Sequence, residues 1–176
     1  MTGMEVSFEP LTKKTIPSYI EVGTQSYKEH YLHLWKGQDP KPYLDISFTK
    51  EVAQLELDDP NCLNYLVKCQ NVNAGILKIE IDHKCADWSA NDALYLHRIY
   101  LLKSATGQNI GKKVLAFTDN LARNFNKKVI WLETMKKGKA KNFYQNHGYQ
   151  TIGESNVQLL GILEEEKAMW VMVKHL

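Results

Sequence analysis

The chain has 176 residues and a formal net charge of +2, and 44% of its residues are hydrophobic and 24% charged. This composition predicts one globular domain over residues 1–176, large enough to bury a full core. The small net charge and the lack of a basic stripe argue against nucleic-acid binding, and no apolar run approaches the roughly 20 residues of a membrane-spanning helix.

The N-terminal third predicts one strand followed by helices. Apolar and polar residues alternate over residues 6–10, which favours a short strand. A helical pattern begins at Thr15, and Pro17 suits only the first turn of that helix. The glycine, aspartate and prolines of residues 37–42 indicate a break, and a second helix is expected over about residues 49–57.

Two β-prone segments follow. Residues 64–69 and 74–81 are rich in apolar and β-branched side chains, and the polar residues 70–73 between them predict a turn. We therefore expect a β-hairpin. The polar residues 82–92 that follow it predict a loop.

The middle of the chain carries the clearest pattern. A strand-like segment begins at Leu94, passes through a glycine-containing turn and leads into a helix. The apolar stripe of that helix consists of Ile110, Val114, Phe117 and Leu121. Residues 129–132 then form a continuous apolar run typical of a strand buried on both faces. A strand, a helix and a strand in this order predict a right-handed parallel crossover.

The C-terminal part predicts a short helix and a second pair of strands. The helix is expected over residues 140–147, and Gly148 follows it where a left-handed C-cap residue is preferred. Residues 149–152 and 168–173 are expected to form antiparallel strands. Together the elements predict an α/β (α+β) fold, with a mixed central sheet of about 6–7 strands and helices on both faces.

Signals of secretion and of metal binding are both lacking. The first ten residues contain charge and proline where a signal peptide needs an apolar run. The three cysteines, Cys62, Cys69 and Cys85, have no metal-type spacing and predict reduced thiols. We expect a cytoplasmic protein that holds no metal.

The turn after the central strand has the features of an anion site, because free N–H groups and the helix dipole favour negative charge there. It does not match a P-loop, since Gly107 and Gly111 enclose three residues instead of four and Lys112 is followed by lysine. The dinucleotide fingerprint G-x-G-x-x-G is also absent. A nucleotide kinase and a dehydrogenase are therefore disfavoured.

Three blocks carry a family resemblance: residues 98–102, residues 106–111 and residues 143–149. Together with their spacing they resemble the GNAT family of N-acetyltransferases, most closely the bacterial acetyltransferases of small amines and polyamines. The resemblance covers residues 74–153. It implies the GNAT fold, with central strands that splay apart at the cofactor site, and transfer of an acetyl group directly from acetyl-CoA to a primary amine.

The resemblance also implies the site. Its cofactor-binding positions are Ile99, Tyr100, Leu101, Thr106, Gly107, Gln108, Asn109, Ile110, Gly111, Lys112 and, for the 3′-phosphate, Lys137. Tyr144 would give a proton to the leaving thiolate, because a tyrosine with a pKa of about 10 can donate to a thiolate whose conjugate acid has a pKa of about 8.5. The candidates for removal of the amine proton are Glu80, Asp82, His97 and Glu133, of which Glu80, acting through water, is favoured. The acceptor pocket would be formed by Tyr31, His33, Trp35 and His97.

The chain departs from the usual family turn, Q/R-x-x-G-x-G/A, at two positions. Thr106 replaces Gln or Arg, and Asn109 replaces the middle glycine. Lys137 also stands where the family often has asparagine. These departures keep open a CoA-binding sensor or partner module without turnover, besides a purely structural domain. The acceptor, a small amine or a protein amine, also stays open, and family analogy suggests a homodimer formed through the C-terminal strands.

Overall fold

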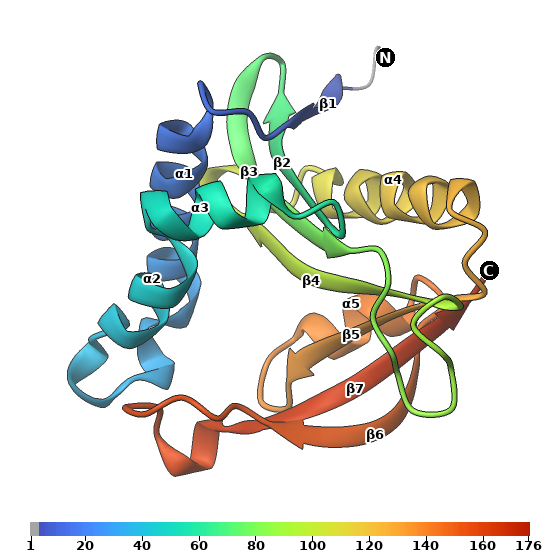
Figure 1. The fold of residues 1–176 in the computed structure, drawn as a ribbon. Coiled ribbons are helices and arrows are strands. Elements are labelled where there is room, and N and C mark those ends of the chain that lie inside the picture. Colours follow the sequence, from blue (N-terminus) through green and yellow to red (C-terminus); the bar gives the residue numbers. More distant parts are fainter. Residues whose placement is uncertain (1–3) are drawn as a thin grey trace.

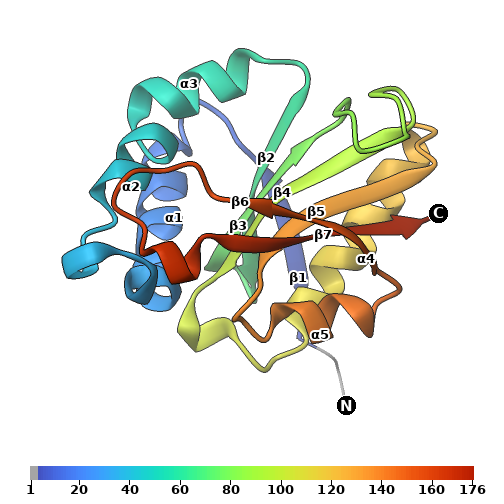
Figure 2. The ribbon, with the colours of Figure 1, turned by 90° about the horizontal axis from the view of Figure 1, so that it is seen from below.

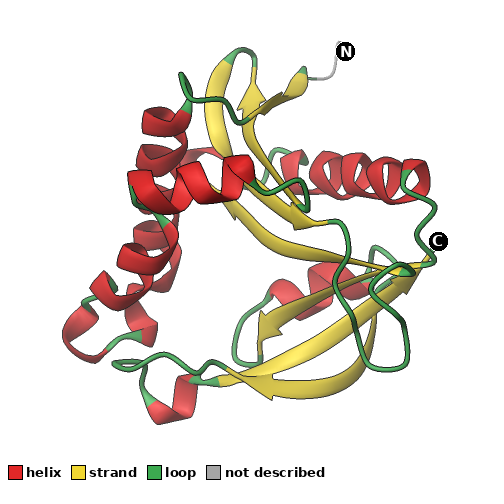
Figure 3. Ribbon diagram, viewed as in Figure 1, coloured by secondary structure: helices red, strands yellow, loops and turns green. Residues whose placement is uncertain are grey.

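The computed structural model describes residues 4–176 and contains a central sheet with helices on both of its faces (Figures 1 and 3). The strands are β1 (Val6–Pro10), β2 (Cys62–Cys69), β3 (Val72–Glu80), β4 (Ala93–Leu101), β5 (Val129–Met135), β6 (Gln150–Asn156) and β7 (Ala168–His175). The helices are α1 (Ile16–Tyr31), α2 (Lys41–Ser47), α3 (Lys50–Asp58), α4 (Ile110–Asn124) and α5 (Ala140–Gln145), with 3₁₀ turns at Leu32–Leu34, Lys36–Gln38, Lys103–Ala105 and Glu164–Glu166. The strand order β1-β2-β3-β4-β5-β7-β6 makes one sheet of seven strands, as the sequence predicts.

The N-terminal elements agree with the prediction except for one missed helix. Pro17 lies in the first turn of α1, and the Thr49 hydroxyl caps α3 by accepting the N–H of Val52. The missed helix is α2. Pro40 and Pro42, interpreted as helix breakers, lie at the N-cap and in the first turn of α2, where proline loses no intrahelical hydrogen bond.

The predicted hairpin is formed by β2 and β3, with a tighter turn than expected. Gln70 and Asn71 both have positive φ angles, of 51° and 63°, and Cys69 pairs directly with Val72. A two-residue turn of this kind matches the twist of the flanking strands. Strand β3 therefore begins at Val72, two residues before the predicted start, and the turn is shorter than residues 70–73.

The predicted parallel crossover is formed by β4, α4 and β5, but the two strands pair over only three residues each. Ala93–Tyr95 lies beside Val129–Trp131, and no further pairing joins the two strands, although they continue to Leu101 and Met135. Beyond Tyr95, β4 pairs only with β3, whereas β5 pairs with β7. The sheet thus consists of two halves joined at one end, and β4 diverges from β5 (Figure 1).

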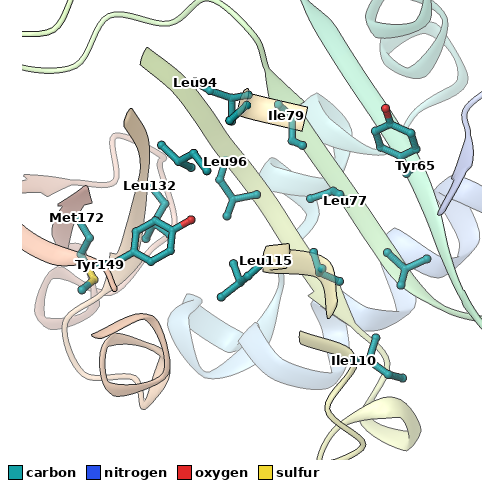
Figure 4. Packing of buried hydrophobic residues seen from close by; sticks show 14 of the residues in the cluster. Tyr65, Leu77, Ile79, Leu94, Leu96, Ile110, Leu115, Leu132, Tyr149 and Met172 are labelled. Atoms are coloured by element: carbon teal, nitrogen blue, oxygen red, sulfur yellow. The ribbon is translucent and has the colours of Figure 1, made fainter. Parts of the chain in front are cut away.

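Two layers of helices cover the sheet, and we call its sides the α4 face and the α1 face. Helices α4 and α5 pack on the α4 face, where buried residues of both halves of the sheet share one core (Figure 4). Leu96 of β4 and Leu132 of β5 both belong to this core. Helices α1, α2 and α3 cover the N-terminal half of the α1 face. Burial of each such side chain contributes about 1.5–3 kcal/mol, so the common core holds the two halves together where hydrogen bonds do not.

The C-terminal strands are antiparallel, as predicted, and the connection between them reaches the N-terminal helices. In Figure 2 this connection crosses from β6 to the end of α1 and α2. Ile162 forms an isolated bridge with Trp35, and the Lys36 N–H donates to the carbonyl of Gly161. Within residues 4–176 no helix is long and apolar enough to cross a bilayer.

Candidate active site

The turn between β4 and α4 exposes the first N–H groups of a 15-residue helix, because no side chain caps them. Asn109 occupies the N-cap with a left-handed backbone, φ 60° and ψ 12°, a conformation that asparagine tolerates well. The first turn contains no acidic residue, and Lys112 is exposed. Free N–H groups and the positive end of the helix dipole favour a bound anion here.

Side chains of the same turn hold it in shape. Thr106 Oγ1 donates to the carbonyl of Lys103 at 2.7 Å, and Gln108 Nε2 donates to the carbonyl of Ser104 at 2.7 Å. Gly107 has a φ of 76°, and no atom lies within 4 Å of the position that its β-carbon would occupy. The threonine that departs from the family pattern therefore closes the loop, and the donor set and open space of the turn fit a diphosphate.

Strand β4 directs alternate N–H groups toward the side from which β5 diverges. The Leu102 N–H donates to the carbonyl of Ala74 on β3, just before Gly75. Tyr100 lies two residues before Leu102 and pairs with Ile76 in the same register, so its N–H also faces β3. Because N–H groups alternate along a strand, those of Ile99 and Leu101 point away from β3. The N–H of Tyr100 points toward β3, so its contribution to a site comes from its ring.

Tyr144 lies on α5 at the α4 face, with its ring tilted against the rings of Phe143 and Tyr149. Burial raises the pKa of Tyr144 well above its ordinary value, and the neighbouring Tyr31 raises the pKa further. The side chain is nevertheless only half-buried by exposure. Tyr144 thus keeps its hydroxyl proton at neutral pH and can donate it.

Four tyrosines form a connected group on the α1 face, which we call the tyrosine cluster: Tyr27, Tyr31, Tyr43 and Tyr100. The hydroxyls of Tyr43 and Tyr100 lie 2.7 Å apart and share a hydrogen bond. Burial raises the pKa of Tyr31 to about 12. The cluster therefore presents aromatic rings, and the protonated hydroxyl of Tyr31, beside the diverging part of β4.

The four residues predicted to line an acceptor pocket do not come together. Tyr31 belongs to the tyrosine cluster, and His97 lies further along the α1 face. Trp35 is only 2% exposed and donates its Nε1–H to the Tyr27 hydroxyl at 3.0 Å, so it is a core residue behind the cluster. His33 is exposed in the 3₁₀ turn after α1. The chain leaves α1 at Tyr31, so helical spacing no longer places His33 and Trp35 beside Tyr31.

A group of polar side chains lies on the α1 face where β4 and β5 begin to separate. Oε1 of Glu80 lies 2.7 Å from Nδ1 of His97, and Oε2 lies 2.5 Å from Nδ1 of His83. These contacts, with that to His97 the largest, hold the pKa of Glu80 at about 2. Next to them, the Tyr95 hydroxyl donates to Glu133 at 2.9 Å, and the Tyr95 ring stacks on His97.

The sequence did not single out His83 or Tyr95. Tyr95 could have been found, because it lies two residues from His97 and strand alternation places both on one face. His83 carries no such signal, since it follows the end of β3 in an irregular loop. In the part of the chain that the structure describes, no group of three or more His, Cys, Asp or Glu side chains is arranged to hold a metal ion.

A cavity of about 320 Å³ adjoins this region. It is lined by Lys84, Cys85, Ala86, Trp131, Ile152, Gly153, Glu154 and Val171. The Trp131 ring also stacks on Tyr95, with ring centroids 4.1 Å apart. The cavity therefore continues the α1 face from the histidine pair toward β6 and β7.

The basic run after β5 contacts the C-terminal strands and the connection between them. Lys137 forms an ion pair of 2.9 Å with Glu166. Lys136 pairs with Glu154, and both Lys136 and Lys141 lie over the ring of Trp170. A phosphate at Lys137 would therefore compete with a carboxylate that already holds this lysine.

Central strands that diverge beside an anion turn are what the resemblance to the GNAT family of acetyltransferases implies, and comparison with known proteins gives the same family. The chain matches the Acetyltransferase (GNAT) family over residues 26–149 and belongs to that family. It is an acetyl-CoA-dependent N-acetyltransferase of the GNAT fold.

Individual relatives are distant in sequence. The chain is 26% identical over 162 residues, 92% of either chain, to an uncharacterized N-acetyltransferase in the pepI 3′ region of Lactobacillus delbrueckii subsp. lactis. Its fold is similar to that of a PaiA N-acetyltransferase from Thermoplasma acidophilum in complex with coenzyme A, with a TM-score of 0.76, 17% identity and coverage of 98% of this chain and 100% of that chain. A GNAT acetyltransferase from Streptococcus pneumoniae gives a TM-score of 0.73 at 18% identity, covering 98% and 99%.

Proposed function

We propose that the protein transfers the acetyl group of acetyl-CoA to the primary amine of a small cationic acceptor of the polyamine type. The observation that carries this proposal is the divergence of β4 from β5 beyond Tyr95, next to the uncapped N-terminus of α4. This arrangement places the free N–H groups of β4 and those of the α4 N-terminus along one path, which we call the thioester path. A co-substrate that carries both a thioester and a diphosphate needs both sets of donors.

The backbone of the path binds the co-substrate. Residues 107–112 donate N–H groups to the pyrophosphate, and Lys112 adds positive charge. The N–H groups of Ile99 and Leu101 lie where the thioester carbonyl would gain negative charge, which is the geometry of an oxyanion site. Removal of one such donor typically costs about 10²–10³ in rate.

Tyr144 acts as the proton donor to the leaving sulfur. Burial keeps its hydroxyl protonated at neutral pH, and a thiolate is a strong enough base to accept that proton during C–S cleavage. The side chain as a whole is half-buried and not sealed in the core.

The α1 face binds the acceptor. A cation is attracted to aromatic ring faces, of which the tyrosine cluster supplies several, and to carboxylates such as Glu133. The cavity beside Trp131 offers about 320 Å³ for the remainder of a small molecule.

Two measurements test the proposal. Isothermal calorimetry with acetyl-CoA should show saturable binding, and a thiol-release assay with spermidine, other primary amines and lysine peptides should show turnover with the small cations. A lack of acetyl-CoA binding would refute the proposed co-substrate site. Binding without CoA release in the presence of any amine would instead support the sensor interpretation.

A homodimer in the cytoplasm is the second part of the proposal. Strand β6 is an edge of the sheet, so its outer N–H and C=O groups can pair with those of a second copy. Light scattering coupled to size-exclusion chromatography tests this, and a mass of one chain at micromolar concentration would refute it.

A further inference from the structure

Glu80 lies at the centre of a group of four side chains. Its Oε1 atom lies 2.7 Å from Nδ1 of His97 and 3.7 Å from Nζ of Lys78. Its Oε2 atom lies 2.5 Å from Nδ1 of His83. The carboxylate is 18% exposed, so these contacts replace most of its hydration.

The chemistry of the carboxylate determines which histidine nitrogens carry hydrogen. An ionised carboxylate can only accept hydrogen bonds, so both Nδ1 atoms must be donors. A neutral imidazole has one N–H, so a neutral His97 has a free lone pair on Nε2. Burial lowers the pKa of His97, with contributions from Arg98 and Lys78, against the opposing effect of Glu80. The low pKa of Glu80, about 2, makes the carboxylate itself a weak proton acceptor.

Of the two histidines, His97 lies nearer the thioester path. Lys78 pairs with Arg98 and Ile79 with Leu96, so His97 is the extra residue of a β-bulge in β4. Bulges re-aim a side chain and are common beside active sites. His97 lies two residues before Ile99, whose N–H faces the diverging side, and its ring is packed against Tyr95.

His83 lies at the closed end of the sheet instead. Its ring contacts those of Tyr95 and Trp131, and its carbonyl accepts the Trp131 Nε1–H at 3.0 Å. Tyr95 and Trp131 belong to the three-residue segments over which β4 and β5 still pair. His83 is thus fixed where the strands are together, and His97 where they separate.

We propose that His97 is the general base of the acetyl transfer, with Glu80 as the positioning residue that fixes its tautomer and His83 as a second donor that fixes Glu80. The inference rests on the proposed function and changes the predicted role of Glu80 from base to positioning residue. Nε2 of His97 takes one proton from the acceptor ammonium, and the freed lone pair forms the N–C bond. The C–S electron pair stays on sulfur, which takes the Tyr144 proton. The second proton of the amine nitrogen restores the tyrosine hydroxyl, so the products are the amide, the thiol and one proton on His97.

The tautomer can be measured without knowing the acceptor. Long-range ¹H–¹⁵N correlation spectra of the full chain at pH 7.5 should show His97 neutral with hydrogen on Nδ1, a minority tautomer for free imidazole. In Glu80→Gln the amide can donate as well as accept, and His97 should lose its fixed tautomer. His33, which is exposed, serves as the internal reference. A wild-type His97 with hydrogen on Nε2, or charged at this pH, would overturn the inference even if the enzyme is active.

Kinetics separate His97 from His83. His97→Gln should lower kcat by about 10²–10⁴-fold, the usual contribution of a general base, with little change in the KM for acetyl-CoA. His83→Gln keeps a donor for Glu80 and should lower kcat by only about three- to tenfold, less than His97→Gln does. Glu80→Gln should lower kcat and shift the acid limb of the pH profile. Wild-type inactivity with every amine would refute the proposed function, whereas an active wild type with an unimpaired His97→Gln, or with His83→Gln as the inactive variant, would refute the inference alone.

Discussion

Phe143 of α5 packs directly over Gly111 in the first turn of α4: a β-carbon at residue 111 would lie 3.1 Å from the Phe143 ring. A side chain at residue 111 would therefore press on the Phe143 ring, which would have to shift by a few tenths of an ångström. Phe143 precedes Tyr144, so this contact also sets how the proposed proton donor lies relative to the anion turn.

Gly111→Ala should weaken acetyl-CoA binding about three- to tenfold and lower the free energy of unfolding by about 1–3 kcal/mol, the usual effect of overpacking. Calorimetry and urea denaturation measure the two effects. Gly138→Ala is the matched control, because the nearest atom to its β-carbon would lie at an ordinary 3.6 Å. A second substitution, Phe143→Leu, should restore part of the affinity, and equal losses in Gly111→Ala and Gly138→Ala would contradict this explanation.

Tyr144→Phe should lower kcat about 10- to 100-fold and leave the Kd for acetyl-CoA within about threefold, because a proton donor acts in the transition state and not in binding. Stopped assays of CoA release together with calorimetry measure both quantities. Tyr149→Phe is a close control, since the buried Tyr149 hydroxyl has no hydrogen-bond partner within the described chain and its removal should not destabilise the fold. An unchanged kcat in Tyr144→Phe would remove Tyr144 from the mechanism.

Asn109→Gly should preserve acetyl-CoA affinity, whereas Asn109→Val should weaken binding and destabilise the protein by about 1–2 kcal/mol. The reason is the left-handed backbone at residue 109, which glycine adopts freely and a β-branched residue adopts only at that cost. Thermal unfolding with and without acetyl-CoA measures both effects. If Asn109→Val binds as tightly as wild type, the left-handed residue is not needed for the anion turn.

Because of the Glu80 carboxylate, the free energy of unfolding should fall more steeply on acidification in the wild type than in Glu80→Gln. The folded-state pKa of Glu80 is about 2, below the ordinary value of 4.5, so the ionised group stabilises the fold above pH 4.5. This contribution is lost as the pH falls from 4.5 toward 2. Burial also lowers the pKa of His97 from 6.5, which costs stability below pH 6.5, but burial acts in both proteins. Urea midpoints between pH 7 and pH 3.5 measure the difference, and parallel curves for the two proteins would contradict it.

The value of kcat/KM should likewise fall at acidic pH. The base must be neutral, and the pKa of His97 is lowered from 6.5, so kcat/KM should stay constant through neutral pH. It should fall only as the pH drops below 6.5. An acid limb above pH 7 in the free enzyme would indicate a different group.

The sequence alone determined the class of this protein. Local patterns predicted the hairpin, the parallel crossover and the C-terminal strands, because each depends on residues close together in the chain. The blocks at residues 98–102, 106–111 and 143–149 identified the family for the same reason. The left-handed backbone of Asn109 likewise follows a preference of the residue itself.

Only the tertiary structure decided how the site is arranged. Helix α2 was missed because the same prolines that break a helix interior are compatible with its first turn. Trp35 was assigned to a pocket and lies in the core, because the end of α1 and the β6–β7 connection, distant in sequence, close over it. The Glu80 group joins β3, the following loop and a bulge in β4, and a one-residue bulge leaves no trace in a sequence pattern. Pairing across strands, and not spacing along the chain, brings His97 and Glu80 to hydrogen-bonding distance.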